Sequence, residues 1–137
     1  MSDLFIGQSA TITRNFTTED VAAYRHLTGD SGLQFGEKIE TAVPGPLLAG
    51  MISTLLGTEC PGQGTNWLKQ QLTYPRATVV GEPITAVVTI TRLRPEKYLV
   101  NLQTTCTNAA GLPVCQGEAL VFIKDRQTYN QEVSPSM

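Results

Sequence analysis

The sequence predicts an α+β domain in which one antiparallel β-sheet wraps around a single α-helix. Two observations support this fold class. The stretch Leu47–Leu56 is apolar around most of its circumference, so as a helix it requires cover from other structure. Four segments with β-strand composition follow it in a row, and strands joined by short connections pair antiparallel. A sheet that curls around the helix would hide its whole apolar surface.

The composition fits one globular domain and excludes several kinds of partner. The 137 residues are 41% apolar and 16% charged, with a formal net charge of −2. We assign residues 1–124 to a single domain and residues 125–137 to a polar C-terminal tail. The ten Lys and Arg residues are scattered, so no basic stripe is available for nucleic acid. No stretch approaches the ~20 apolar residues of a membrane span, and we expect a cytoplasmic protein without a membrane partner.

The cysteines and the single histidine do not indicate a metal site. Cys60, Cys106 and Cys115 form no Cys-x-x-Cys pair, and their odd number suits reduced thiols. We interpret them as packing residues, because a thiol behaves as a small apolar group. His26 cannot assemble a ligand set with such scattered sulfurs, so we predict no bound metal.

The N-terminal part of the chain predicts a strand followed by a capped helix. Ser9–Phe16 is rich in β-branched residues, which favour strands. Thr17 and Asp20 resemble a capping box, and the acidic side chain in the first turn suits the helix dipole. The predicted helix covers Thr18–Thr28 and ends at Gly29, a typical C-terminal cap.

Helical spacing assigns the two faces of this first helix. Val21, Tyr24 and Leu27 recur at the spacing of one face and should point toward the core. Arg25 and His26 fall on the other side and should point toward solvent. His26 is a surface residue in this interpretation and not a catalyst.

An irregular segment from Asp30 to about Val43 separates this helix from the apolar one, and a functional loop could lie there. Pro46 suits the first turn of the apolar helix, because its missing N–H costs nothing at that position. Gly50 within Leu47–Leu56 costs about 1 kcal/mol of helix propensity relative to alanine. Such a glycine predicts the close approach of another backbone or of a ligand.

Four predicted strands complete the domain. The turn signal Asn108–Gly111 joins the last two as a hairpin. We interpret Trp67, in the first of them, as a core or pocket-wall aromatic residue. A single sheet leaves an edge strand unpaired, and two copies that pair their sheets relieve this, so we expect a homodimer. The predicted strands are Asn66–Tyr74, Ile84–Leu93, Tyr98–Thr107 and Val114–Lys124.

Sequence matches along nearly the whole domain resemble the MaoC-like (R)-specific enoyl-thioester hydratases, which adopt the hot-dog fold. The resemblance implies an enzyme that adds water to a trans-2-enoyl thioester or removes it from the (R)-3-hydroxy form. It implies no cofactor besides the substrate carrier, which is coenzyme A or acyl carrier protein. The matching residues are Phe16–Val21, Leu27–Asp30, Gly50–Met51, Leu55–Gly57, Pro61–Gly64, Gly81–Glu82, Thr105–Asn108 and Gly117–Ala119.

Only half of the family's catalytic pair is present in this chain. The aspartate of the family motif Asp-x-Asn-Pro-x-His matches Asp30. Without a gap the histidine falls on Phe35; with one deletion it falls on Gln34, which keeps apolar residues on both sides of a polar one. We prefer the second alignment. The resemblance thus assigns Asp30 and Gln34 to catalysis, and it assigns to substrate binding Ser31, Leu33, Phe35, Ala49, Gly50 and Met51.

Hydration requires an acid, a base and donors for the charge that develops on the thioester oxygen. Gln34 cannot exchange protons, so Asp30 would act alone, with its pKa raised if apolar neighbours bury it. The alternative is that Asp30 only caps the loop by accepting backbone hydrogen bonds. The family match places the oxyanion donors at the start of the central helix, near Ala49 to Met51. Glu37 and Glu40 are expected to be solvated.

Three functions remain open at this point. The first is hydratase or dehydratase activity on an acyl thioester, which would make the chain a hydro-lyase. The second is a repurposed isomerase, cyclase or dehydratase of a specialised, polyketide-like pathway, which the missing histidine favours. The third is a non-catalytic acyl-binding subunit that pairs with an active homologue.

Overall fold

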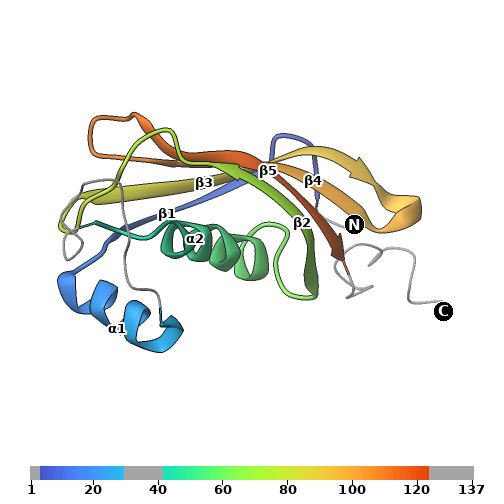
Figure 1. Ribbon diagram of the computed structural model, residues 1–137. Helices are drawn as coiled ribbons and strands as arrows, with labels where there is room; N and C mark the ends of the chain where they lie inside the picture. The colour runs from blue at the N-terminus through green and yellow to red at the C-terminus, as the bar shows by residue number, and fades with distance from the viewer. Residues whose placement is uncertain (1–3, 30–41, 124–137) are drawn as a thin grey trace.

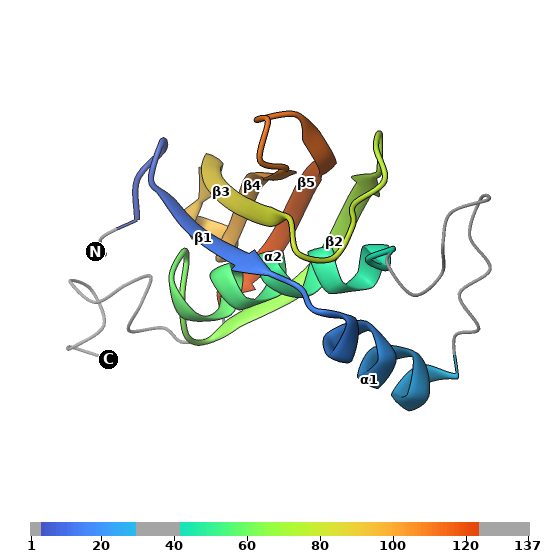
Figure 2. The ribbon, with the colours of Figure 1, turned by 90° about the vertical axis from the view of Figure 1, so that its left-hand side faces the viewer.

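The computed structural model describes residues 4–29 and 42–123 of the chain. Its elements are β1 (Ser9–Asn15), α1 (Thr18–Thr28), α2 (Gly45–Thr58), β2 (Thr65–Thr73), β3 (Pro83–Arg94), the 3₁₀ turn η2 (Pro95–Lys97), β4 (Leu99–Thr107) and β5 (Pro113–Ile123). The strands form one antiparallel sheet in the order β1-β3-β4-β5-β2. The sheet arches over α2, and α1 lies beside the start of that helix (Figures 1 and 2). The predicted α+β class, with an antiparallel sheet around a central helix, is confirmed.

Both ends of α1 are set by local hydrogen bonds, as the sequence predicts. The Thr17 hydroxyl accepts from the Asp20 N–H at 3.0 Å, and the Asp20 carboxylate accepts from the Thr17 N–H at 2.9 Å. This reciprocal pair is a capping box and satisfies two backbone donors of the first turn. At the other end Gly29 takes the left-handed conformation, with φ of 75°, and its N–H donates to the Arg25 carbonyl.

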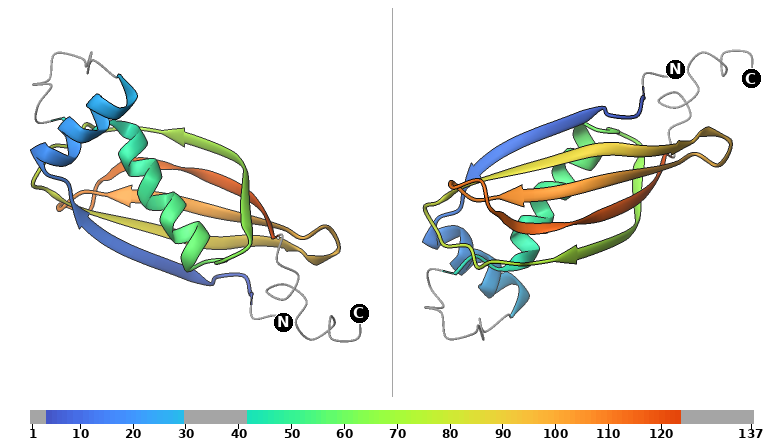
Figure 3. Two further views of the ribbon diagram at one scale, coloured as in Figure 1. Left: turned by 90° about the horizontal axis from the view of Figure 1, so that it is seen from below. Right: turned by 90° about the horizontal axis from the view of Figure 1, so that it is seen from above.

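The predicted faces of α1 are only partly correct. Val21 is buried and His26 is exposed as expected, but Leu27 is 85% exposed. Two guanidinium nitrogens of Arg25 are buried instead of facing solvent. The reason is that α1 lies beside α2 and outside the sheet (Figure 3). The face of α1 that contacts the rest of the protein is therefore not the face on which its apolar residues lie.

The central helix is longer than predicted and is not covered all round. α2 begins at Gly45 and ends at Thr58, two residues beyond the predicted helix on each side. One face carries its buried side chains, namely Leu48, Met51, Ile52, Leu55 and Leu56. The face that points away from the sheet (Figure 3) is small or polar and exposed, with Pro46, Gly50, Ser53, Thr54 and Thr58. The sheet thus shields the apolar side of the helix, as predicted, and leaves this small, polar face open.

Gly50 belongs to this exposed face. A Cβ built on it would meet no atom within 4 Å. We predicted that another backbone or a ligand approaches Gly50 closely. No backbone among the described residues does so, and the close approach of a second molecule would explain why this position has no side chain.

The hydrophobic core lies between α2 and the inner face of the sheet. The three cysteines are free and buried, which confirms their role in packing. Trp67 lies on the edge strand β2 and is 38% exposed, so it is not a core residue, and its alternative role in a pocket wall stays a prediction. Largely alternating residues of the three central strands supply the sheet's side of the core: Ile84, Ala86, Val88, Ile90, Val100, Leu102, Cys106, Val114, Cys115, Ala119, Val121 and Ile123.

Gly117 allows the edge strand to join the sheet at close range. A Cβ on Gly117 would overlap the carbonyl group of Gln71 in β2 and would lie 3.1 Å from the Leu72 Cα. On the other side, Thr104 donates its hydroxyl hydrogen to the Gly117 carbonyl at 3.0 Å. Strand β2 and the Thr104 side chain both contact the backbone of Gly117, so a side chain at this position would displace a strand.

We predict that Gly117→Ala destabilises the fold by about 1–3 kcal/mol, the range typical of overpacking. Gly57→Ala is the matched control, because a Cβ at this helical glycine meets nothing within 4 Å. The control should be neutral or stabilising by up to about 1 kcal/mol of helix propensity. Urea unfolding of both variants measures this, and equal stabilities would contradict the close approach.

Candidate functional site

Five of the eight predicted site residues lie outside the described residues: Asp30, Ser31, Leu33, Gln34 and Phe35. The same holds for Glu37 and Glu40. The last turn of α1 contacts the backbone that leads into α2, because Arg25 Nη2 donates to the Ala42 carbonyl at 3.4 Å. The last turn of α1 and Ala42, which precedes α2, therefore lie close together.

The other three predicted residues lie within α2 and not at its start. Since the helix begins at Gly45, the N–H groups of Ala49, Gly50 and Met51 belong to its second turn, where helical hydrogen bonds engage them. Their side chains also point in different directions: Met51 is buried, Gly50 is exposed and Ala49 is half-buried. The expected helix start near Ala49 was therefore wrong, and the substrate-binding roles assigned to Ala49, Gly50 and Met51 stay predictions.

The helix start itself offers an amide at Gly45. Among the described residues no side chain caps this end, and Pro46 has no N–H. The Leu47 N–H donates to the Pro44 carbonyl at 3.0 Å. The Gly45 N–H is thus left at the positive end of the helix dipole, where an anionic oxygen is favoured.

The ring of Tyr74, just after β2, lies directly against Gly45. A Cβ on Gly45 would lie 2.8 Å from Tyr74 Cζ and 3.2 Å from its hydroxyl oxygen. Tyr74 is 46% exposed, so the phenol borders both the helix start and solvent. From the sequence, Tyr74 is only the last residue of a predicted strand. The single, weak signal of the contact was Gly45 between two prolines, which indicates crowding at the start of the helix.

Behind Tyr74, two buried thiols lie on neighbouring strands as cross-strand partners, Cys106 and Cys115. Cys106 Sγ donates to the Leu48 carbonyl of α2 at 3.8 Å. Interaction with Cys115, together with burial, raises the pKa of the Cys106 thiol, so that thiol stays protonated. Both thiols also raise the pKa of Tyr74. We call these three side chains the phenol–thiol cluster.

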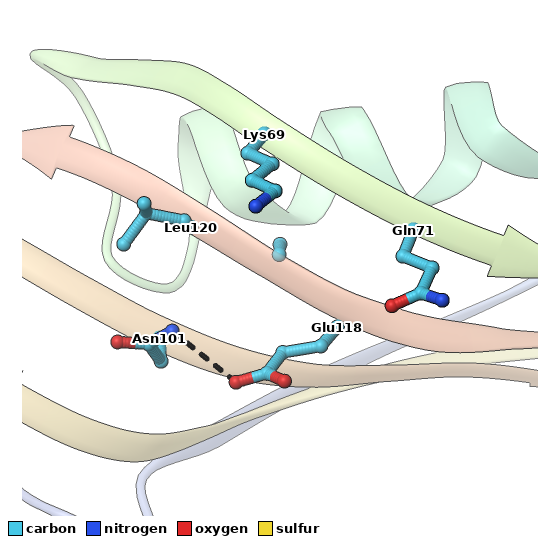
Figure 4. A pocket seen from close by; sticks show the side chains of 6 residues that line it. Lys69, Gln71, Asn101, Glu118 and Leu120 are labelled. Carbon is cyan, nitrogen blue, oxygen red and sulfur yellow. Dashed lines mark hydrogen bonds between the residues drawn. The ribbon is translucent and has the colours of Figure 1, made fainter.

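A second polar site lies on the outer face of the sheet, which points away from α2. Lys69, Gln71 and Leu120 line a hollow of about 180 Å³ with Asn101 and Glu118 (Figure 4). Asn101 Nδ2 donates to Glu118 Oε2 at 3.2 Å, and Arg94 Nη2 donates to Asn101 Oδ1 at 2.7 Å. Asn101 thus connects Arg94 and Glu118, and the hollow is smaller than the roughly 300–1,000 Å³ of typical ligand pockets.

The described side chains and helices also bear on metal binding and membrane crossing. Within residues 4–29 and 42–123, no three His, Cys, Asp or Glu side chains come together in a way that could hold a metal ion. No helix in these same ranges has the length and apolar character needed to cross a membrane. The helix start and the phenol–thiol cluster are thus the chemically distinctive features on the inner side of the sheet.

Solved structures place the chain in the hot-dog class of α+β proteins. The (R)-hydratase from Aeromonas caviae involved in PHA biosynthesis superposes with a TM-score of 0.81 at 33% identity, covering 90% of this chain and 99% of that one. The unliganded R-hydratase PhaJ1 from Pseudomonas aeruginosa gives a TM-score of 0.77 at 27% identity, with 88% of this chain and 82% of that chain covered. The predicted fold class is thereby confirmed.

Sequence comparison identifies the family. An (R)-specific enoyl-CoA hydratase from Rhodospirillum rubrum is 36% identical over 132 residues, which cover 90% of this chain and 91% of the relative. A 3-hydroxybutyryl-CoA dehydratase from Methylorubrum extorquens is 28% identical over 91% of this chain and 84% of its own length. No protein-family model matches. The chain belongs to the family of MaoC-like (R)-specific enoyl-CoA hydratases, as its sequence motifs indicate.

The environment of Tyr74 predicts a late phenol ionisation. Burial, and then the neighbouring Cys115 and Cys106, raise the pKa of Tyr74 above that of an ordinary tyrosine. The phenol should therefore keep its proton through neutral and mildly alkaline pH. Absorbance titration of tyrosinate in the native chain, compared with Tyr74→Phe, isolates this group. A phenol that ionises at or below the pH of tyrosine in the urea-unfolded chain would contradict the described surroundings.

Proposed function

We propose that this protein is a hydro-lyase that hydrates trans-2-enoyl thioesters or dehydrates their (R)-3-hydroxy forms. The observation that carries the proposal is its family membership over nine tenths of the chain. The start of α2, which no side chain of the described residues caps, supports it. Coenzyme A and acyl carrier protein are both candidate carriers of the acyl group, and no other cofactor is required.

In this proposal the thioester oxygen is bound at Gly45. Its N–H points out of the first turn of α2 and meets the negative charge that develops as water attacks C3. Removing one such donor typically costs about 10²–10³ in rate, or about 3–4 kcal/mol of barrier. Pro44 and Pro46 on either side fix the backbone, so the amide would be oriented before substrate arrives.

Asp30 supplies the proton transfer in the proposed reaction, and Gln34 orients the water. A glutamine can donate and accept hydrogen bonds but cannot carry a proton at neutral pH. Leu33, Phe35 and Ser31 would line the acyl group around this carboxyl. Apolar neighbours of that kind would raise its pKa, which makes a carboxyl a usable acid or base near neutrality.

The test is hydration of crotonyl-coenzyme A and longer enoyl thioesters, followed by absorbance of the conjugated double bond. Asp30→Asn keeps the shape but removes the proton carrier, and should lower kcat about 10²–10⁴-fold. Gln34→His restores a second acid–base group and should raise the rate, by up to about 10²-fold. The same series on acyl carrier protein thioesters identifies the carrier.

The outcomes of this assay separate the competing functions. Wild-type hydration that survives Asp30→Asn would reject the assigned role of Asp30. Binding of acyl thioesters without any hydration would favour a repurposed isomerase, cyclase or dehydratase. Recovery of activity only with an added active homologue would favour a non-catalytic acyl-binding subunit.

We also propose that two copies pair through β2. Both β1 and β2 are edges of the sheet, but the exposed residues of β1 are polar, whereas β2 exposes Trp67 and Leu68. An exposed apolar edge strand favours pairing with another strand. Gly50 and the rest of the small, exposed face of α2 would let a second helix approach closely.

The pairing predicts that Leu68→Lys weakens the dimer, because a charge would be placed in the interface. We expect the dissociation constant to rise at least about tenfold, or 1.4 kcal/mol, in sedimentation equilibrium. Leu112→Lys is the matched control: Leu112 is 42% exposed and Leu68 53%, but Leu112 lies after the β4–β5 turn. Equal effects of the two changes would argue against the β2 edge.

A further inference from the structure

We propose that Gln70 holds the ring of Trp67 in one orientation, in which the ring anchors the contact between the β2 strands of two copies of this chain. The inference rests on the pairing proposed above and adds to it the side chain that positions its largest apolar residue. Trp67 is the single tryptophan of the sequence and is 38% exposed on an edge strand. Its indole N–H donates to Gln70 Oε1 at 3.0 Å.

A β-bulge brings these two side chains to the same face of the sheet. Residues three apart in a regular strand point to opposite faces. In β2 the register with β5 shifts at Leu68, which is the extra residue of the bulge. Trp67 lies opposite the core residue Val121, and Gln70 lies opposite Ala119, which is also part of the core. Both side chains therefore project from the inner face, on the side of α2.

The orientation of the Gln70 amide is fixed by partners at both of its ends. An indole N–H can only donate, so the amide atom that faces it is the oxygen. The amide nitrogen faces three acceptors: the Glu118 carbonyl at 3.0 Å, the Gln71 carbonyl at 3.0 Å and the Thr104 hydroxyl at 3.3 Å. Thr104 is fully buried in β4, and its hydroxyl in turn donates to the Gly117 carbonyl at 3.0 Å. The amide thus connects the edge strand to β5 and β4 and cannot rotate freely.

A tryptophan held in this way suits a contact between proteins. Tryptophan is enriched among the residues that contribute most to binding at interfaces. A side chain that already has one orientation loses less conformational entropy on binding than a mobile side chain. Because the bulge interrupts the regular edge at Leu68, a partner meets side chains at this end of β2 and not a continuous ladder of backbone groups.

A second copy of the chain fits this surface. The pairing of β2 with another β2 strand brings the inner faces of two sheets, each with its α2 helix, next to each other. The exposed face of α2 carries only small or polar side chains and leaves room there for the indole ring of the other copy. The exposed ring of Trp67 then becomes buried between the two copies, which an apolar side chain favours.

The first experiment measures dissociation of the dimer by sedimentation equilibrium. Gln70→Met keeps the length of the side chain but removes the acceptor of the indole hydrogen. We expect the dissociation constant to rise about three- to tenfold, the worth of one hydrogen bond. Gln71→Met is the matched control and should leave the dissociation constant unchanged, because Gln71 is the next residue of the strand and lines the hollow on the outer face (Figure 4).

A double-mutant cycle with Trp67→Phe tests whether Gln70 acts through the indole. Phenylalanine has no N–H, so in this background Gln70→Met should have no further effect on the dissociation constant. Fluorescence anisotropy of the single tryptophan gives a second measurement at concentrations below the dissociation constant, where the chain is monomeric. There Gln70→Met should lower the anisotropy, since the ring is no longer held, and Gln71→Met should not.

The outcomes separate this inference from the pairing on which it rests. If Leu68→Lys weakens the dimer but Gln70→Met does not, or if Gln70→Met weakens it equally with and without the indole, the pairing stands and the role of Gln70 is overturned. A wild-type chain that stays monomeric overturns both, while hydration of crotonyl-coenzyme A still supports the hydratase. Should Gln70→Met fail to fold, Trp67→Phe alone decides: it should weaken the dimer at least about threefold, and an unchanged dissociation constant overturns the inference.

Discussion

The packing of α2 against the inner face of one curved sheet is the constraint on which the structure depends. Leu48, Ile52 and Leu55 are almost fully buried there, and each such side chain contributes roughly 1.5–3 kcal/mol of burial free energy. The sheet can reach the helix from both sides only because Gly117 lets β2 lie close to β5. The axis and the start of α2 are fixed by this packing, and so is the position of Gly45.

The same packing places the chemistry at one end of the molecule. The first turn of α2, the last turn of α1 and the end of β2 meet there (Figures 1 and 3), which brings Gly45, Arg25 and Tyr74 into one region. An amide donor and a phenol therefore border one region of the described structure. The thiols behind Tyr74 connect this region to the core.

Local signals in the sequence predicted local structure well. The capping box and Gly29 set the limits of α1, because both depend on residues within one turn. The start of α2 could not be predicted in the same way, since Pro44 and Gly45 provide no side-chain cap. The exposure of Leu27 and the contact between Gly45 and Tyr74 depend on how distant elements pack, and no periodicity within a segment contains that information. Asp30 and Gln34 follow from family resemblance and lie outside the described residues.

Gly45 lies between two prolines, and this has a spectroscopic consequence. Neither Pro44 nor Pro46 carries an amide hydrogen, so in amide spectra of the protein the Gly45 amide hydrogen has no sequential amide hydrogen on either side. A ligand oxygen bound at the start of α2 would shift that one resonance first. Pro44 and Pro46, which hold the backbone in place, thus make the Gly45 amide a reporter of ligand binding at the start of α2.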